Sequence, residues 1–226
     1  MSAKPPSKRP AKMRLFIVDD HPMMRDGLAQ LISKEADLTM CGEAEDAADA
    51  LAKIEKEKPD LALVDITLRS GNGLELIKDL RLRAPETAVL VISMHDESLY
   101  AERVLRAGGR GYIMKQEGGK KLMEAIRHVL SGKTYVSEKM SAKILDIFSG
   151  WRGEGSSPVE ALTDREFEVF QLISQGLGTK EIAHKLHVSA KTVEVHRVNM
   201  KQKLKVGTAA ELIHFAVRWV ESQKGA

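Results

Sequence analysis

Acidic, hydroxyl and lysine side chains directly follow four short apolar runs in the first half of this chain. In chain order, the residues at these positions are Asp19 and Asp20, Asp65, Ser93, and Lys115. Short apolar runs separated by helical patterns are typical of buried parallel strands. Because the carboxyl ends of such strands line one crevice of an open α/β sheet, we expect these polar side chains to converge there.

The converging side chains are suited to phosphoryl chemistry. Neighbouring carboxylates repel one another strongly, and an all-oxygen acidic cluster suits a hard divalent cation, most often Mg²⁺. A carboxylate beyond those that the metal requires can attack phosphorus to form an acyl phosphate, while the metal and a lysine hold the transferring oxygens. Ser93 can then donate a hydrogen bond to the new phosphoryl group.

Each of these residues also has an ordinary structural explanation when it is taken alone. A strand-end Asp is commonly a helix cap or a turn residue, and Asp20 before Pro22 can simply open a helix. Ser93 alone suits a hydroxyl bonded to backbone, and Lys115 alone suits a solvated surface lysine. The joint occurrence of these residues at strand ends favours the phosphoryl site.

The strings around these residues resemble the receiver domain of two-component response regulators, over roughly the first half of the protein. They read Val18-Asp19-Asp20-His21-Pro22, Leu63-Val64-Asp65-Ile66 and Gly111-Tyr112-Ile113-Met114-Lys115. The resemblance implies that Asp65 is the phosphoacceptor. It implies a Mg²⁺ site formed by Asp19, Asp20, Asp65 and the main-chain carbonyl of Thr67.

The same resemblance implies further roles around the phosphoacceptor. Lys115 is expected to bind the phosphoryl group, Ser93 to be the switch hydroxyl, and Tyr112 to be the aromatic switch residue. Thr67 and His95 each lie two residues beyond a site residue, where the family tunes how fast the phosphoryl group is hydrolysed.

Helical patterns alternate with the apolar runs. They cover roughly residues 22–35, 46–57, 73–84, 97–107 and 118–131. This alternation predicts a flavodoxin-like receiver, an α/β doubly wound five-stranded parallel sheet, over residues 13–133. The other predicted segments are a disordered tail at 1–12, a linker with room for a short helix at 134–160, and a small all-α helix-turn-helix domain at 161–226.

The composition suits a soluble protein of a reducing compartment. Hydrophobic residues make up 43% of the 226 residues, enough for an ordinary globular core. The single cysteine, Cys41, excludes an internal disulfide framework, and no stretch approaches transmembrane length. We therefore expect a cytoplasmic protein without a membrane partner.

The second half of the chain has the pattern of a helix-turn-helix. Thr163 and Glu166 stand at capping-box spacing before an apolar helix. Thr179 is expected to cap a short helix, and Ser189 a longer one that ends near Leu204. Two helices joined in this way match a helix-turn-helix, whose second helix enters the major groove of DNA.

The longer helix has a core face and a basic face. Val193, Met200 and Leu204 recur at helical spacing and should face the core. Residues 185–205 contain six Lys or Arg against one acidic residue, Glu194. Such a bias matches neutralisation of DNA phosphates, although a solvated surface explains it equally when the helix is taken alone.

The segment from about Ala161 to Val220 resembles the LuxR-type helix-turn-helix of the NarL/FixJ class of response regulators. The matching strings are Leu162-Thr163-Asp164-Arg165-Glu166, Lys180-Glu181-Ile182-Ala183 and Lys191-Thr192-Val193-Glu194-Val195-His196-Arg197-Val198-Asn199. Phosphate or structural contacts are then expected from Lys191, Thr192, His196, Arg197 and Asn199. Positions that can meet base edges are Glu194, Val195 and Val198. His196 equally suits a partly buried structural histidine.

Both halves together predict a phosphorylation-dependent transcriptional response regulator that binds double-stranded DNA. A sensor histidine kinase or a small phosphodonor would phosphorylate Asp65, after which Ser93 and Tyr112 would shift together. Release of the DNA-binding domain and homodimerisation on phosphorylation are two routes that the sequence does not distinguish. The last helix, roughly Thr208 to Glu221, carries more apolar residues than one core face needs, which fits a dimer contact.

Two other classes of protein fit parts of the pattern. A metal-dependent phosphatase could also use an aspartyl phosphate, but such folds usually place the nucleophile after the first strand, whereas Asp65 follows the third. A constitutive DNA-binding protein would keep the receiver as a dimerisation scaffold only. The acidic pair, Asp65, Ser93 and Lys115 argue against that scaffold. We therefore expect a regulator and not an enzyme acting on an external substrate.

Overall fold

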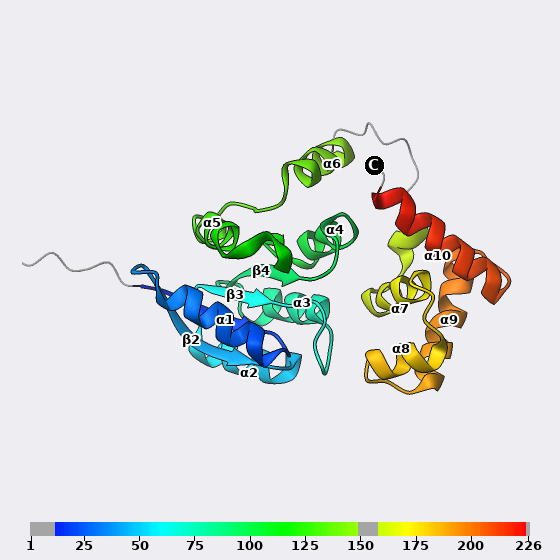
Figure 1. Cartoon of the computed structure of the whole chain (residues 1–226), viewed down its shortest axis with the longest axis horizontal. Helices are drawn as coiled ribbons and strands as arrows, with labels where there is room; N and C mark the ends of the chain where they lie inside the picture. Colours follow the sequence, from blue (N-terminus) through cyan, green and yellow to red (C-terminus); the bar gives the residue numbers. More distant parts are fainter. Residues whose placement is uncertain (1–11, 149–157, 225–226) are drawn as a thin grey trace, which may run out of the picture.

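A computed structural model describes residues 12–148 and 158–224 of the chain. The predicted disordered tail, apart from Lys12, and the middle of the predicted linker lie outside these residues. Figure 1 shows the described part as two lobes, a sheet flanked by helices and a group of helices that follows it in the sequence.

The first lobe contains a five-stranded parallel sheet. Its strands are β1 (Met13–Val18), β2 (Leu38–Ala44), β3 (Leu61–Val64), β4 (Ala88–Ser93) and β5 (Gly111–Met114). They lie in the order β2-β1-β3-β4-β5, and every neighbouring pair is parallel. All four residues of β3 are buried, as expected for a strand covered on both faces. The predicted doubly wound sheet is confirmed.

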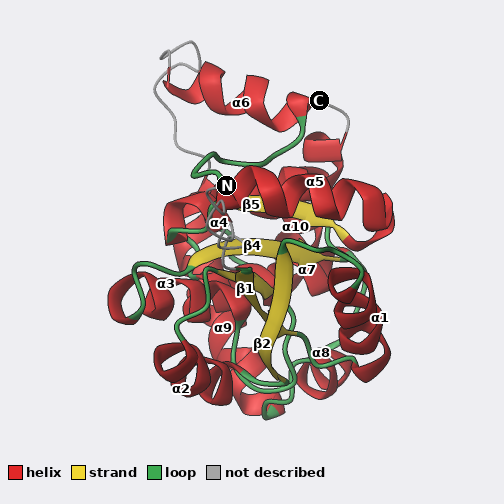
Figure 2. Cartoon of the chain, turned by 90° about the vertical axis from the view of Figure 1, so that its left-hand side faces the viewer, coloured by secondary structure: helices red, strands yellow, loops and turns green. Residues whose placement is uncertain are grey.

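Five helices cover the two faces of the sheet. They are α1 (Pro22–Ser33), α2 (Ala47–Glu57), α3 (Gly73–Arg83), α4 (Glu97–Ala107) and α5 (Gly118–Leu130). A short 3₁₀ turn, η1 (Lys115–Glu117), links β5 to α5. Figure 2 shows α1 and α5 on one side of the sheet and α2 and α3 on the other. Alternate residues of β1 follow the same division, because Leu15 and Ile17 belong to one hydrophobic cluster while Phe16 and Val18 belong to another.

Side-chain caps begin three of these helices. Asp46, Asn72 and Asp96 accept hydrogen bonds from main-chain N–H groups in the first turns of α2, α3 and α4. Gly73 follows the cap of α3, and a Cβ there would lie 2.2 Å from the main-chain oxygen of Asp65. Glycine therefore lets the start of α3 pack directly against the end of β3.

The remaining described elements are helical. They are α6 (Glu138–Phe148), the 3₁₀ turn η2 (Pro158–Ala161), α7 (Asp164–Ser174), α8 (Thr179–Lys185), α9 (Ala190–Leu204) and α10 (Ala209–Lys224). The capping box of α7 is confirmed, since the Thr163 hydroxyl accepts from the Glu166 N–H and the Glu166 carboxylate accepts from the Thr163 N–H. Ser189 caps α9 as expected.

The predicted cap of α8 was wrong by one residue. Gly178 is the cap, and Thr179 is already the first helical residue. The Glu181 carboxylate accepts the hydrogen bond from the Gly178 N–H. The Thr179 hydroxyl is thereby free of the capping role and donates instead to Glu194 on α9, at 2.6 Å. Its hydrogen bond thus joins the two helices of the helix-turn-helix.

Candidate functional site

Three carboxylates meet at the carboxyl ends of β1 and β3. These neighbouring strands pair Val18 with Val64, so the acidic pair and Asp65 emerge side by side. Asp19 is fully buried and Asp65 is 3% exposed. Together with Asp20 and His21, they bring one potential ligand atom each to within 4.8 Å of one another. The convergence that the strand ends predicted is present.

Lys115 reaches this cluster from the carboxyl end of β5, the edge strand of the sheet. Its Nζ lies 2.6 Å from Oδ2 of Asp19 and 2.6 Å from Oδ2 of Asp65, and its side chain is 4% exposed. Burial acts to lower the pKa of Lys115, but the two carboxylates outweigh burial and raise it. Lys115 therefore stays protonated at neutral pH and holds a positive charge between two buried carboxylates.

Burial has the opposite effect on the acceptor carboxylate. It raises the pKa of Asp65 above the ordinary range, while the ammonium of Lys115 lowers it. The Thr67 N–H also donates to Oδ1 of Asp65, at 3.3 Å. One oxygen of Asp65 thus faces the lysine and the other faces the loop that leads to α3.

The acidic cluster has the donor set of a site for a hard cation. Oδ1 of Asp20 is a buried atom without a hydrogen-bond partner among the described residues. Nδ1 of His21 lies 2.7 Å from it, within ion-pair distance. A buried carboxylate oxygen that accepts no hydrogen bond is suited to a divalent cation. The residues present therefore fit Mg²⁺.

Ser93 is the last residue of β4, and Tyr112 lies within the neighbouring strand β5. Ser93 is fully buried, and its hydroxyl accepts from the His95 N–H at 3.3 Å. Tyr112 is 1% exposed, and its hydroxyl donates to the main-chain oxygen of His95 at 2.8 Å. Both predicted switch residues therefore bond to one loop, the β4–α4 loop, through a single residue.

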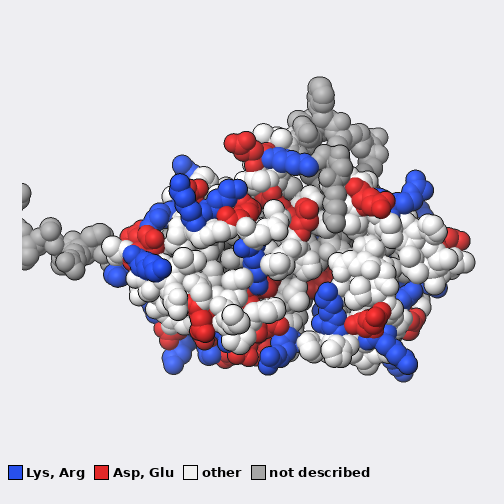
Figure 3. All heavy atoms as spheres, in the orientation of Figure 1, with Lys and Arg blue, Asp and Glu red and all other residues white. Residues whose placement is uncertain are grey.

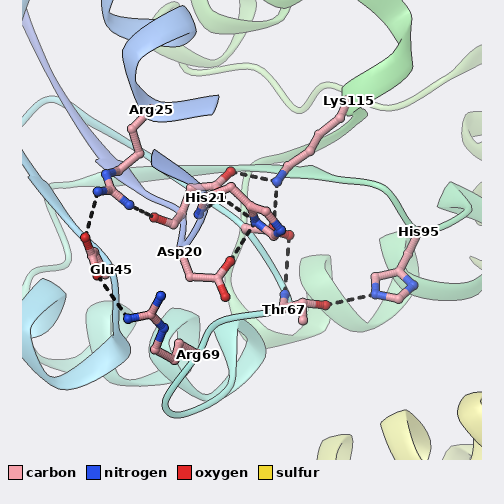
Figure 4. A network of polar contacts seen from close by, with 10 residues as sticks. Asp20, His21, Arg25, Glu45, Thr67, Arg69, His95 and Lys115 are labelled. Carbon is pink, nitrogen blue, oxygen red and sulfur yellow. Dashed lines mark hydrogen bonds and ion pairs between the residues drawn. The ribbon is translucent and has the colours of Figure 1, made fainter. Parts of the chain in front are cut away.

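Thr67 and His95 contact each other across the site. The Thr67 hydroxyl and Nε2 of His95 lie 3.0 Å apart, as Figure 4 shows. Burial, and then the charges of Lys185 and Lys115, lower the pKa of His95 to about 4, so the imidazole is neutral at pH 7. The two residues, expected from the family resemblance to tune hydrolysis, are thus hydrogen-bonded partners.

Sequence reasoning missed a further polar group beside the acidic pair. Arg25 in α1 donates to the main-chain oxygen of Asp19 at 2.7 Å and to the Glu45 carboxylate at 2.8 Å. Figure 4 shows Arg25, Glu45 and Arg69 as a row beside Asp20. An arginine in the first turn of a helix has no periodic signal that would separate it from a surface residue, so only the structure identifies it.

The helix α9 presents its predicted faces. Val193 and Met200 are fully buried and Leu204 is 5% exposed, which confirms the core face. Val195 is 51% exposed and Val198 is 47% exposed, an unusual degree for valine on a packed helix. These two exposed valines are among the residues predicted to meet base edges.

The polar residues of α9 divide into exposed and half-buried groups. Lys191 and Glu194 are exposed, whereas Thr192, His196, Arg197 and Asn199 are half-buried. The Thr179 hydroxyl lies 3.3 Å from the Arg197 guanidinium and also bonds to Glu194. Burial is the largest influence on His196 and lowers its pKa, which favours the structural role over a cationic phosphate contact.

Charges on the face drawn in Figure 3 are mixed, with Lys and Arg interspersed among Asp and Glu over both lobes. The formal net charge of the chain is only +3. Electrostatic attraction to DNA therefore depends on the local bias along α8 and α9, since the chain as a whole is close to neutral.

Arg103 of α4 links the two lobes. It donates to the main-chain oxygens of Leu162 at 3.0 Å and Val159 at 2.7 Å, and it lies 3.2 Å from the Asp164 carboxylate. Its guanidinium also lies over the ring of Phe167, 4.0 Å from the centroid. One receiver side chain thus contacts η2, the following turn and α7.

Aromatic rings continue this contact. The His95 ring lies 4.8 Å from Tyr100 of α4, and Tyr100 meets Phe167 of α7 edge-on at 5.3 Å between centroids. Trp219 of α10 lies 5.7 Å from Phe167. A row of rings therefore runs from the β4–α4 loop into the core of the second lobe. Figure 1 shows α7 on the receiver side of that lobe and α9 beyond it.

Comparisons with known proteins identify both halves of the chain. Residues 15–127 match the family described as response regulator receiver domain, and residues 160–216 match the bacterial regulatory proteins of the luxR family. The chain belongs to the response regulator family. Its receiver followed by a LuxR-type helix-turn-helix confirms the predicted NarL/FixJ class.

Relatives resemble this chain over nearly its whole length. The oxygen regulatory protein NreC of Staphylococcus carnosus is 34% identical over 211 residues, which cover 91% of this chain and 97% of that protein. A solved structure of RcsB from Salmonella enterica serovar Typhimurium, bound to promoter rprA in the presence of the phosphomimetic BeF₃⁻, is 25% identical with a TM-score of 0.60. It covers 91% of this chain and 98% of the RcsB chain.

The family establishes the general function. The chain is a DNA-binding response regulator of transcription and not an enzyme acting on an external substrate, as the sequence led us to expect. This excludes the metal-dependent phosphatase as the function of the whole chain. Within residues 12–148 and 158–224, no helix has the length and apolar character that crossing a bilayer requires.

Proposed function

We propose that Asp65 accepts a phosphoryl group from a sensor histidine kinase and that this event controls DNA binding by α9. The observation that carries the proposal is the bridge from Lys115 to Asp19 and Asp65 inside a buried acidic cluster. Such an arrangement leaves one carboxylate as a nucleophile while a cation and a lysine neutralise the rest.

Transfer is a displacement at phosphorus. A carboxylate oxygen of Asp65 forms a bond to phosphorus, and the bond from phosphorus to the kinase imidazole, or to acetate in a small donor, breaks. The electron pair of that bond leaves with the donor group. Lys115 lies within reach to hold a phosphoryl oxygen, because its Nζ already contacts Oδ2 of Asp65.

Mg²⁺ would be held by Asp19, Asp20, Asp65 and the main-chain carbonyl of Thr67, and when bound it supplies neutralising charge for the transferring oxygens. The geometry of Asp19 and Asp65 supports this assignment, since both are buried and share Lys115. Oδ1 of Asp20 accepts no hydrogen bond among the described residues, which supports the inclusion of Asp20.

Ser93 and Tyr112 would report the phosphoryl group to the β4–α4 loop. If Ser93 turned to donate its O–H to the phosphoryl oxygen, its oxygen would move relative to the His95 N–H that it now accepts from. Tyr112 bonds to the carbonyl of the same residue, so a shift of His95 would move both contacts together. The loop then responds as a unit.

The interface between the lobes supports release of the second lobe as the consequence. His95 packs on Tyr100, and Tyr100 packs on Phe167 of α7, so movement of the β4–α4 loop would disturb the contact that Arg103 completes. Some of the apolar residues of α10 pack within the second lobe, since Phe215 and Trp219 both contact Phe170. Ile213 is 41% exposed and would be available to a second copy once the lobes separate.

The DNA contacts follow from the exposed face of α9. Lys191 would neutralise phosphate, and Val195 and Val198 would meet thymine methyl groups in the major groove of double-stranded DNA. A pair of recognition helices from a homodimer would read two half-sites. We propose a cytoplasmic location, where kinase cytoplasmic domains and DNA are both accessible.

Intact mass of the wild type and of Asp65→Asn after acetyl phosphate and Mg²⁺ tests this function. We expect addition of one phosphoryl group to the wild type and none to the variant. DNA affinity and oligomeric state are recorded on the same samples. Absence of labelling in the wild type, where a control receiver is labelled, would instead support the constitutive DNA-binding scaffold.

A further inference from the structure

Arg25 carries a buried charge that neither the phosphoryl site nor the DNA surface uses. The residue is 7% exposed, in the first turn of α1. Buried arginines are rare unless their donors are paired, and this one has two short hydrogen bonds, to Asp19 and to Glu45. The two acceptors show which segments this buried arginine holds in place beside the acidic cluster.

The first bond of Arg25 acts on the peptide that joins the acidic pair. Its Nη1 donates to the main-chain oxygen of Asp19 at 2.7 Å. The N–H of the same residue, Asp19, donates to the Ala44 oxygen at 3.2 Å. The orientation of the peptide between Asp19 and Asp20 sets the direction in which the Asp20 side chain leaves the backbone. Arg25 therefore restrains the carboxylate of Asp20 through the main chain, without touching it.

The second bond of Arg25 fixes the guanidinium itself. Nη2 donates to Oε1 of Glu45 at 2.8 Å, and Nε lies 3.5 Å from the carboxylate of Glu43. The other oxygen of Glu45 lies 3.8 Å from Arg69 in the β3–α3 loop. Planar donors arranged as a fork can hold two acceptors at once, which a lysine cannot do.

The row formed by Arg25, Glu45 and Arg69 spans the three loops around the acidic cluster, as Figure 4 shows. It runs from the start of α1 through the β2–α2 loop to the loop that carries Thr67. The backbone reinforces the second junction, because the Ala47 N–H donates to the Ser70 oxygen at 3.2 Å. Its charges balance, since Glu43 and Glu45 offset the two arginines.

We propose that Arg25, held by Glu45, is a positioning residue of the metal site, which presets the Asp19–Asp20 peptide so that the Asp20 carboxylate faces the cation. The inference rests on the proposed Mg²⁺ site of Asp19, Asp20 and Asp65. Groups that orient metal ligands commonly contribute about 10-fold or more to metal affinity without touching the metal.

Electrostatics and positioning make opposite predictions for removal of the charge. Arg25→Met deletes a positive charge close to the cation site, so Coulomb interaction alone would tighten Mg²⁺ binding. Loss of positioning would weaken it. The double variant Arg25→Met/Glu45→Gln removes one charge of each sign, so a change in its affinity cannot come from net charge.

The test is calorimetric Mg²⁺ binding to the unphosphorylated full chain, with the phosphorylation rate from acetyl phosphate measured over a range of Mg²⁺ concentrations. We expect Kd for Mg²⁺ to rise by about 10-fold in both variants. The rate at saturating Mg²⁺ should remain close to that of the wild type. Arg25→Lys, which keeps the charge but not the fork, should not restore the affinity.

Arg14 provides a matched control. It also donates to a main-chain oxygen and to a glutamate carboxylate, both of Glu57, but it lies at the opposite end of β1. Arg14→Met should leave the Kd unchanged. An unchanged or tighter Kd in both Arg25 variants would overturn the positioning role, as would an equal loss in Arg14→Met or full rescue by Arg25→Lys.

The variant Asp20→Asn distinguishes failure of the positioning role of Arg25 from failure of the proposed Mg²⁺ site. If Asp20→Asn weakens Mg²⁺ binding while the Arg25 variants do not, the metal site stands and the positioning role fails. If neither the wild type nor any variant binds Mg²⁺, the metal site itself is wrong and the role of Arg25 fails with it. A weakened Kd in Asp20→Asn and in both Arg25 variants supports both.

Discussion

The buried acidic cluster of the receiver and the exposed face of α9 differ in how their polar groups are paired. Asp19 and Asp65 are buried and share the Lys115 ammonium at 2.6 Å. Lys191 and Glu194 on α9 are exposed, and two valines stand beside them in solvent. The charges of the buried cluster are paired within the protein, whereas the side chains of the exposed face are turned to solvent.

This difference sets the size of the effects that substitutions should have. Removing one member of a buried, paired cluster leaves its partners uncompensated, whereas an exposed charge exchanges its partner for water. We therefore expect large, nearly all-or-none effects at the acceptor site, and graded, salt-dependent effects on α9.

The largest effect is expected from Lys115→Met. The variant loses the cation that two buried carboxylates share, so the rate of phosphorylation by acetyl phosphate should fall by about 100-fold or more. Lys121→Met is the matched control, because that lysine pairs with Glu117 on the surface of α5. Intact-mass time courses measure both. A rate within twofold of the wild type in a folded Lys115→Met, checked by circular dichroism, would remove Lys115 from the mechanism.

A smaller effect is expected where the two regions are joined. Arg103→Ala removes three hydrogen-bonded contacts, to η2, the following turn and α7. The unphosphorylated protein should then bind DNA about 10-fold more tightly, within the usual range of coupling between sites. Arg83→Ala is the control, since the Arg83 side chain bonds within the receiver, to Glu55. Fluorescence anisotropy with labelled DNA gives the comparison. Equal affinities for Arg103→Ala and the wild type would argue that the lobe interface does not restrain DNA binding.

Substitutions of a charged and of an apolar residue on α9 should affect DNA binding in different ways. Lys191→Ala should weaken binding by a similar factor on all DNA sequences and reduce the slope of affinity against salt by about 1, because it removes one phosphate contact. Val198→Ala should leave the salt slope unchanged and weaken binding only at sites with a thymine at the contacted position. If both variants altered the salt slope equally, the assignment of Val198 to base contact would be incorrect.

The smallest effect concerns pH. Burial lowers the pKa of His196 in the folded protein below its ordinary value of 6.5, so the unfolded chain takes up the proton first. The contribution to stability is therefore present above about pH 6.5 and is lost as pH falls through the lowered pKa. Between pH 7 and pH 5, the urea concentration at the unfolding midpoint should fall less in His196→Gln than in the wild type. A steeper fall in the variant would contradict a neutral, buried imidazole.

The sequence predicted the convergence of Asp19, Asp20, Asp65 and Lys115 correctly because all four residues follow strand ends. Apolar runs place Asp65 and Lys115 at one edge of the sheet, and their chemistry then restricts what they can do together. The cap of α8 was assigned one residue late, because glycine offers no side chain to recognise and a neighbouring threonine does. The sequence carried no signal for Arg25 or Arg103, since both roles depend on contacts between segments far apart in the chain.

The exposure of this face also explains why the sequence of α9 does not determine which DNA sequence it prefers. A buried carboxylate cluster accepts few ligands, so its chemistry can be read from residue types. An exposed face bearing Glu194, Val195 and Val198 is compatible with many operators, because base preference depends on how the helix docks and on the deformability of the DNA.

DNA affinity of one wild-type sample, measured before and after phosphorylation, tests most directly whether the buried site controls the exposed one. Intact mass of the same sample establishes the extent of labelling, and Asp65→Asn treated identically is the control. The account predicts tighter binding by the labelled wild type and no change in the variant. Complete labelling of the wild type with unchanged DNA affinity would contradict it.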